Sequence, residues 1–249
     1  MFKRSICALT LIAGLLGCSG SPGTGGAMKE QIAETYENGA KKKVNYFAGN
    51  KIARTQYFAE DGTMKSDQFF KDGQPDSSRI IYFPDGSKDK ETFYKLGKKQ
   101  GPERSWHANG QLKSDANYNA DLPEGKAVNY YENGKIASEV SYVNGKKEGP
   151  DITYYPNGNK KYVMNNVGGN YDGLEEEYYE NGKIKKQTTW KNNVMNGPKI
   201  TYFENGKKEE EANYTDGALE GKKTLWNAKG KKISDAIYEK GVLISGESY

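Results

Sequence analysis

The stretch from Gly125 to Glu148 reads GKAVNYYENGKIASEVSYVNGKKE and is one copy of a 24-residue unit. Further copies follow without a gap, beginning at Gly149, Gly173 and Gly197. A turn glycine recurs every 24 residues through the chain, at Gly62, Gly86, Gly110, Gly134, Gly158, Gly182, Gly206 and Gly230. Self-similarity at a fixed period of this length is typical of a repeat architecture.

Two aromatic columns run through the repeats. When the first glycine of a copy is counted as position 0, position 5 holds Phe58, Tyr82, Trp106, Tyr130, Tyr154, Tyr178, Tyr202 and Trp226. Position 17 holds Phe70, Tyr94, Tyr118, Tyr142, Asn166, Trp190, Tyr214 and Tyr238. Each column precedes a turn of the form aromatic-x-[Asn/Asp]-Gly or a close variant, and Asn-Gly between strand-like segments strongly indicates a β-hairpin.

The strand register indicates the length of these turns. A two-residue loop at the Asn-Gly of the quoted copy would pair Tyr130 with Ala137, whereas a three-residue loop pairs Tyr130 with Ile136. The second choice puts aromatic and apolar residues on one face, so we predict three-residue loops here and after Tyr142. We also expect both aromatic columns on the same face. The predicted fold is all-β, an elongated antiparallel β-meander of stacked 24-residue hairpins.

The composition agrees with a thin sheet. Charged residues make up 28% of the chain and the mean hydropathy is -0.94, which is too polar for a thick double-layered core. The repeats begin near Lys29 and fill residues 29–249 with about nine copies, so we expect one elongated domain.

Residues 1–18 have the pattern of a lipoprotein signal peptide. A basic start precedes the apolar run Ile6 to Leu16, which is too short to span a membrane. The run ends in Leu-Leu-Gly-Cys18, which resembles the bacterial lipobox, in which the cysteine is retained and carries diacylglycerol. The alternative is an ordinary cleavage site with an unmodified cysteine.

This interpretation implies a membrane partner and a location. Residues 19–28, rich in glycine and serine, are expected to form a flexible tether behind the lipid anchor at Cys18. Ser19 follows the cysteine, where an aspartate would favour retention in the inner membrane. We therefore expect a protein of the bacterial cell envelope, anchored in the outer membrane or at the cell surface.

The repeat resembles a known family. The spaced pattern carried by Tyr142, Gly145, Gly149, Tyr154, Asn157 and Gly158 resembles MORN repeats. The form Tyr-x-Asn-Gly-Lys, as at Tyr131 to Lys135, is similar to the bacterial MORN-repeat variant family, which includes YwqK-type antitoxin components. The resemblance covers Lys29 to about Ser245. It implies stacked antiparallel hairpins used for binding or assembly and not for catalysis.

Three residues depart from the family pattern. Asp121 and Asn193 replace turn glycines, and Asn166 interrupts the position-17 column. We expect these departures to change the local geometry but not the fold.

The sequence carries no catalytic constellation, so we expect neither an enzyme nor a cofactor. His107 is the one histidine, at position 6, where other copies carry tyrosine, and we interpret it as a substitute beside a turn. A His/Cys metal cluster is excluded by the residue counts. The formal charge is +4, but lysines alternate with acidic residues, and a nucleic-acid partner requires clustered basic residues.

Position 6 carries the candidate binding residues. They are Phe83, Tyr131, Tyr155, Tyr179 and Phe203, and by strand alternation we expect them opposite the two aromatic columns. A stripe of exposed aromatic rings often marks an interaction surface. The alternative interpretation is that each ring packs against its neighbours.

Together these patterns predict a non-catalytic, membrane-anchored lipoprotein whose hairpin repeats bind another protein or act as a scaffold. One alternative is an antitoxin or immunity-type protein that neutralises an envelope-acting toxin, as the family resemblance implies. Another is a glycan or cell-wall binding module, because aromatic hairpin repeats can stack sugars, although the chain has only three tryptophans.

Overall fold

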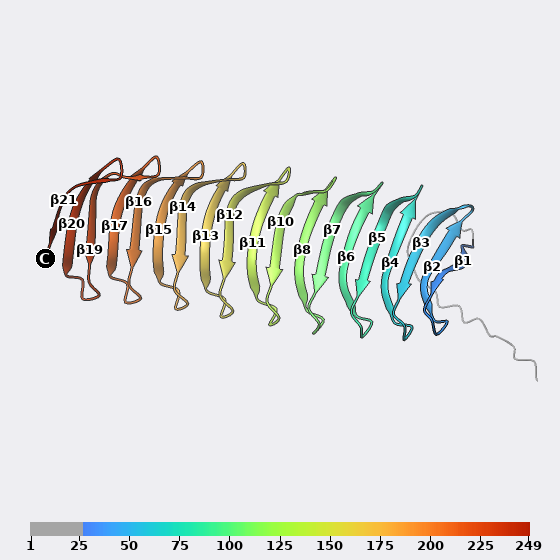
Figure 1. Cartoon of the computed structure of the whole chain (residues 1–249). Helices are drawn as coiled ribbons and strands as arrows, with labels where there is room; N and C mark the ends of the chain where they lie inside the picture. The colour runs from blue at the N-terminus through green and yellow to red at the C-terminus, as the bar shows by residue number, and fades with distance from the viewer. Residues whose placement is uncertain (1–26) are drawn as a thin grey trace, which may run out of the picture.

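The computed structural model describes residues 27–249, which form a single antiparallel sheet of 21 strands (Figure 1). The predicted signal peptide over 1–18, with its lipidation site at Cys18, lies outside the described residues, as does most of the tether.

The strands are β1 (Lys29–Thr35), β2 (Lys41–Ala48), β3 (Lys51–Phe58), β4 (Met64–Lys71), β5 (Gln74–Tyr82), β6 (Lys88–Lys95), β7 (Lys98–Trp106), β8 (Leu112–Asn119), β9 (Leu122–Pro123), β10 (Gly125–Tyr130), β11 (Ile136–Val143), β12 (Lys146–Tyr154), β13 (Lys160–Val167), β14 (Asn170–Tyr178), β15 (Ile184–Lys191), β16 (Val194–Tyr202), β17 (Lys208–Thr215), β18 (Ala218–Leu219), β19 (Gly221–Trp226), β20 (Lys232–Glu239) and β21 (Val242–Ser248).

The strands pair in the order of the chain, which confirms the predicted β-meander. β1 pairs with β2, β2 with β3, and so on to β20 with β21. The two-residue strands β9 and β18 are the first parts of strands that continue as β10 and β19, since β9 and β10 both pair with β8, and β18 and β19 both pair with β17. Figure 1 shows one layer of strands side by side, with β1 at one end and β21 at the other.

The Asn-Gly turn of each repeat has the predicted three-residue loop. Tyr131 N–H donates to the Lys135 carbonyl at 2.9 Å, and Tyr130 pairs with Ile136. Gly134 closes the turn with a φ of 78°, in the left-handed region where glycine has no Cβ to clash. These turns line one long edge of the ribbon (Figure 1).

The turn after the position-17 column is different, and the prediction of a second three-residue loop is wrong. Val143 pairs with Lys146, so only Asn144 and Gly145 form the loop, with φ values of 50° and 79°. Two positive φ angles in a two-residue loop define the type I′ turn, whose twist matches that of the flanking strands.

A bulge in each hairpin also puts the two aromatic columns on opposite faces of the sheet. In β10 and β11, Gly125 pairs with Tyr142 while Tyr130 pairs with Ile136, and β11 carries one extra residue between these pairs. Tyr130 lies five residues along the strand from Gly125 and points to the other face. The expectation that both columns share a face is therefore wrong, because the bulge shifts the alternation by one residue.

Side-chain contacts define the two faces. On the face of the position-17 column, Trp190 Nε1 donates to the Glu175 carboxylate at 2.6 Å. On the face of the position-5 column, the Tyr154 hydroxyl donates to the Glu139 carboxylate, also at 2.6 Å. We call these surfaces the Trp190 face and the Tyr154 face.

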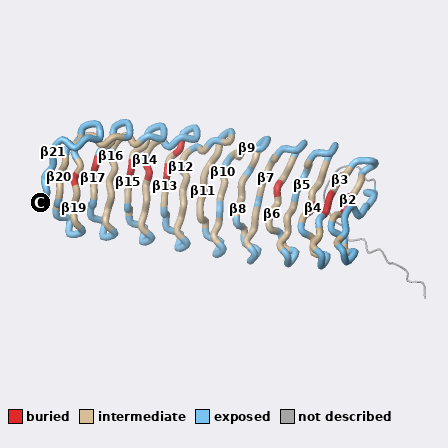
Figure 2. The backbone as a smooth tube through the Cα atoms, viewed as in Figure 1, coloured by how far each residue is buried: buried red, intermediate tan, exposed pale blue. Residues whose placement is uncertain are grey.

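Little of the ribbon is buried, as expected for a single layer (Figure 2). Only three apolar residues within 27–249 are buried: Val44, Met164 and Ala212. The buried polar residues are Asn45, Thr55, Gln56, Asp67, Thr92, Asn166, Glu175, Thr188 and Thr224. Within residues 27–249, buried positions are thus more often polar than apolar.

Candidate functional site

The five predicted binding residues at position 6 each stand directly before the three loop residues of a turn, and all are half-buried. Phe203 lies two residues beyond Thr201, so strand alternation puts it on the same face as Thr201, which pairs with Glu210 on the Trp190 face. The position-6 residues therefore lie opposite the position-5 column, as predicted, but on the same face as the position-17 column.

The hydroxyl groups of the three predicted tyrosines bind the next repeat. Tyr131 donates to the Tyr154 carbonyl at 2.6 Å, and Tyr155 donates to the Tyr178 carbonyl at 2.9 Å. Tyr179 continues the series with a 2.7 Å bond to the Tyr202 carbonyl. These bonds form a ladder that runs from turn to turn along the edge of the ribbon.

Two further residues extend this ladder. Tyr36 in the first repeat donates to the Phe58 carbonyl at 3.0 Å. His107 places Nε2 2.9 Å from the Tyr130 carbonyl, so an Nε2–H donor there makes the bond that a tyrosine makes in other repeats. This contact gives the one histidine of the chain a structural role between repeats.

The rest of the Tyr-x-Asn-Gly-Lys motif also reaches across repeats. Asn157 Nδ2 donates to the Glu180 carbonyl at 3.0 Å, while its Oδ1 accepts the Asn159 N–H within the same turn at 2.8 Å. Lys135 Nζ donates to the Asn157 carbonyl at 2.8 Å. Sequence reasoning assigned the asparagine to its own turn and missed these inter-repeat bonds. The joint recurrence of tyrosine, asparagine and lysine was the available signal.

Asp121 and Asn193, which replace turn glycines, also make hydrogen bonds to a neighbouring repeat. Asp121 and Asn193 adopt φ values of 74° and 67°. The Asp121 carboxylate accepts the Lys99 N–H at 2.8 Å, and Asn193 Oδ1 accepts the Tyr171 N–H at 2.7 Å. The side chains supply acceptors that glycine lacks, and the two-residue turn is retained.

One of the two most buried carboxylates, which are those of Asp67 and Glu175, lies on the Trp190 face. Glu175 is 4% exposed, accepts a hydrogen bond from Trp190 and forms an ion pair with Lys186 Nζ at 2.7 Å. Burial, and then the charge of Glu175, raise the pKa of Tyr162. Both contacts of the carboxylate come from the neighbouring strand β15, and this is the arrangement of a structural ion pair.

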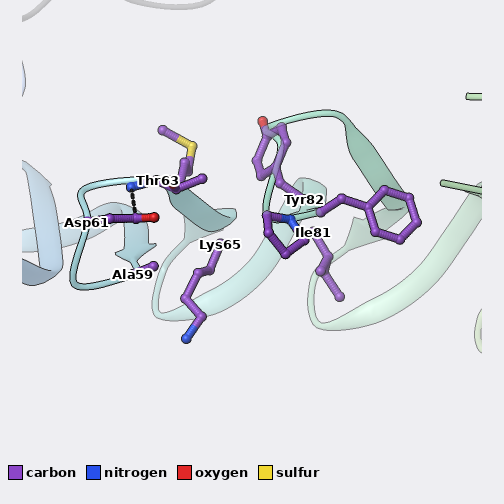
Figure 3. A pocket seen from close by; sticks show the side chains of 9 residues that line it. Ala59, Asp61, Thr63, Lys65, Ile81 and Tyr82 are labelled. Atoms are coloured by element: carbon purple, nitrogen blue, oxygen red, sulfur yellow. Dashed lines mark hydrogen bonds between the residues drawn. The ribbon is translucent and has the colours of Figure 1, made fainter. Parts of the chain in front are cut away.

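Two hollows open beside the position-6 column. One, of 220 Å³, lies between Ala59 and the next repeat at Tyr82 and Phe83 (Figure 3). The other, of 590 Å³, lies between Phe203 and Trp226. Both are apolar depressions between successive turns.

Residues 27–249 contain no group of three or more histidine, cysteine, aspartate or glutamate side chains arranged to hold a metal ion. Within the same residues, no helix is long and apolar enough to cross a membrane.

The model of the MORN repeat variant family matches residues 99–120, 123–144, 171–192 and 195–216. The chain therefore carries MORN repeat variant repeats over residues 99–216, as the sequence resemblance predicted. No curated protein matches the chain.

Two solved structures give weak similarities. A Photorhabdus luminescens Tc holotoxin pore is 13% identical with a TM-score of 0.22, over 87% of this chain and 14% of that chain. A crystal structure of TcdB2-TccC3 is 10% identical with a TM-score of 0.14, over 80% of this chain. The chain spans only 14% and 15% of the length of these two proteins.

Proposed function

We propose that the chain is a non-catalytic lipoprotein of the bacterial envelope, anchored by lipid on Cys18, whose repeats form a binding or scaffold surface for another protein. The observation that supports this most is the openness of the ribbon. Residues 27–249 form one layer with both faces uncovered and only three buried apolar residues. A stable protein interface requires roughly 800 Å² on each partner, which either face of such a ribbon can supply.

Lysine side chains favour a protein partner over a glycan. Lys99 Nζ lies 4.5 Å from the centroid of the Tyr118 ring, and Lys161 Nζ lies 5.7 Å from that of Tyr155. A sugar stacks on an open ring face, and an ammonium group over the ring competes for the same electron density.

Both faces present exposed apolar side chains that a partner can cover. Tyr171 is 41% exposed and touches the Trp190 ring edge-on, with centroids 6.1 Å apart, so it belongs to the Trp190 face. Leu174 is 44% exposed and pairs with Thr189, which places it on the Tyr154 face. These residues mark suitable positions for detecting a partner on either face.

The test is photo-crosslinking in living cells with benzoylphenylalanine at Tyr171 or at Leu174. We expect one face to capture a single stoichiometric protein and the other to serve as the matched control. Capture of no protein from either face would contradict the proposed function. The anchor is tested separately with an alkyne fatty acid, which should label the natural chain and not C18S.

A further inference from the structure

The position-6 column has one internal gap. Ala59 stands where Tyr131, Tyr155 and Tyr179 stand in other repeats, so its methyl group leaves the place of an aromatic ring open. The 220 Å³ hollow lies at this place. Asn227, at position 6 of the repeat that begins at Gly221, also lacks a ring, and its Oδ1 accepts the Lys229 N–H at 2.9 Å within its own turn.

The hydrogen-bond acceptor of the missing side chain is still present. In the complete repeats, the hydroxyls of Tyr131 and Tyr155 donate to the carbonyl at position 5 of the next repeat. The corresponding carbonyl at the hollow belongs to Tyr82, and no side chain within residues 27–249 donates to it. The hollow thus combines space for a ring with an acceptor for its hydroxyl.

The lining fits an aromatic ring. Ile81, Met64 and Pro84 contribute apolar atoms (Figure 3). Two charged side chains, Asp61 and Lys65, also line the hollow, and their charges are opposite (Figure 3). The Asp61 carboxylate accepts the Thr63 N–H at 2.9 Å within its own turn, drawn as the dashed line in Figure 3. A neutral ring with one donor group therefore matches the hollow better than a charged ligand does.

We propose that this hollow binds a tyrosine side chain of the protein partner. The ring lies beside Ala59 in the place of the missing position-6 ring, and the phenolic O–H donates to the Tyr82 carbonyl. The chemistry of the occupant follows from the chain itself, because phenol groups fill the same place in three successive repeats. This proposal rests on the proposed protein-binding function.

The first experiment measures the binding of 4-methylphenol to the full-length protein by NMR, with 4-methylanisole as a control that keeps the ring and lacks the O–H donor. One neutral hydrogen bond corresponds to roughly a three- to tenfold difference in affinity. We expect 4-methylphenol to bind tighter by about that factor. Equal affinity of the two probes would overturn the proposal.

Variants then locate the site. A59Y fills the hollow from within and should abolish 4-methylphenol binding, and A59F should do the same by filling it with a ring alone. Ala108 is an exposed turn residue away from the hollow, so A108Y should bind the probe as the natural chain does. Probe binding that persists in folded A59Y or A59F would contradict the assignment.

The binding of the partner's tyrosine is tested in cells that carry benzoylphenylalanine at Tyr171 or at Leu174, as in the crosslinking experiment above. If the natural chain captures a protein and A59Y or A59F captures at least fivefold less, the tyrosine proposal is supported. Unchanged capture by either folded variant would overturn the proposal while leaving the proposed function intact. Absence of capture by the natural chain would overturn both.

Discussion

Tyr131, Tyr155 and Tyr179 of the position-6 ladder each donate their hydroxyl to a carbonyl 23 residues further along the chain. A hydrogen bond between neutral groups contributes roughly 0.5–1.5 kcal/mol to stability. The aromatic residue of the motif therefore fastens one repeat to the next, in addition to flanking its own turn.

Replacing Tyr155 with phenylalanine tests this contribution. The Y155F variant loses the 2.9 Å bond to the Tyr178 carbonyl and should unfold with a free energy lower by about 1 kcal/mol in urea titration. Tyr57 is 39% exposed, and its hydroxyl makes no hydrogen bond within residues 27–249, so Y57F is the matched control. Equal stability of Y155F and Y57F would contradict the ladder.

Asn166 carries an unpaired acceptor in the most buried part of the sheet. It is 1% exposed, and its Oδ1 has no hydrogen-bond partner. A buried polar atom without a partner costs roughly 1–3 kcal/mol. The Asn166 Nδ2 donates only two long bonds, of 3.4 Å each, to the Gly149 and Met164 carbonyls. Leucine has the same branching and no polar atom, so N166L should raise the unfolding free energy by about 1 kcal/mol. A lower stability of N166L would show that the Asn166 Oδ1 accepts a hydrogen bond in solution.

Two tyrosines of the Tyr154 face should make stability depend on alkaline pH. Burial, and then a hydrogen bond to Glu139, raise the pKa of Tyr154 to about 12. Burial and Glu176 likewise raise the pKa of Tyr178 to about 12. Unfolded tyrosines lose their protons near pH 10. The contribution of these groups to stability is thus complete below about pH 10 and is lost as pH rises toward 12.

This dependence is measured by urea unfolding at several pH values between 9 and 12, together with tyrosinate absorbance. The double variant Y154F/Y178F should show a flatter decline than the natural chain. An identical decline in both proteins would contradict the assignment of these pKa values.

At the scale of the strand and turn, the repeat period and the three-residue loop could be predicted from sequence. Glycine and aromatic spacing fix the period, and only the three-residue loop pairs Tyr130 with Ile136. The bulge could not be predicted, because the extra residue in β11 has no distinctive side chain. The type I′ loop at Asn144-Gly145 was missed because the shared x-Asn-Gly pattern fits both turns.

The candidate site was predictable in part. The position-6 column was visible as a recurring aromatic, but the partner of each hydroxyl is a backbone carbonyl of the next repeat, which has no sequence signature. The residues that replace tyrosine at position 6 indicate the two parts of its role, a ring and a hydrogen-bond donor. His107 retains a ring with an N–H donor, and Phe83 and Phe203 retain only the ring.

Replacing the glycine of the three-residue turn should lower the stability of the protein. Gly134 has a φ of 78°, and a Cβ there would lie 2.9 Å from Gln111 Oε1. The left-handed conformation costs a residue other than glycine roughly 1–2 kcal/mol. We expect G134A to lower the unfolding free energy by about that amount. Asparagine tolerates this conformation, so G134N should cost less, and a larger loss in G134N than in G134A would contradict the turn assignment.

Across the whole molecule, the ribbon is a series of nearly identical units in contact only with their neighbours. Stability in such arrays is approximately a sum over repeats and the interfaces between them. The two end strands β1 and β21 are exposed along their entire length, unlike every strand between them. The position-6 ladder links the turns of this array along one edge (Figure 1).

The most direct test of the single-layer ribbon is a set of electron-electron distances between spin labels at matching turn positions. Glu132, Glu180 and Glu204 are exposed and stand at the same position of their repeats, and C7S and C18S remove the natural thiols. Neighbouring strands lie about 4.8 Å apart, so each repeat adds about 10 Å. The account predicts about 19 Å between 132 and 180 and about 29 Å between 132 and 204. Distances that fail to grow with the number of intervening repeats would contradict it.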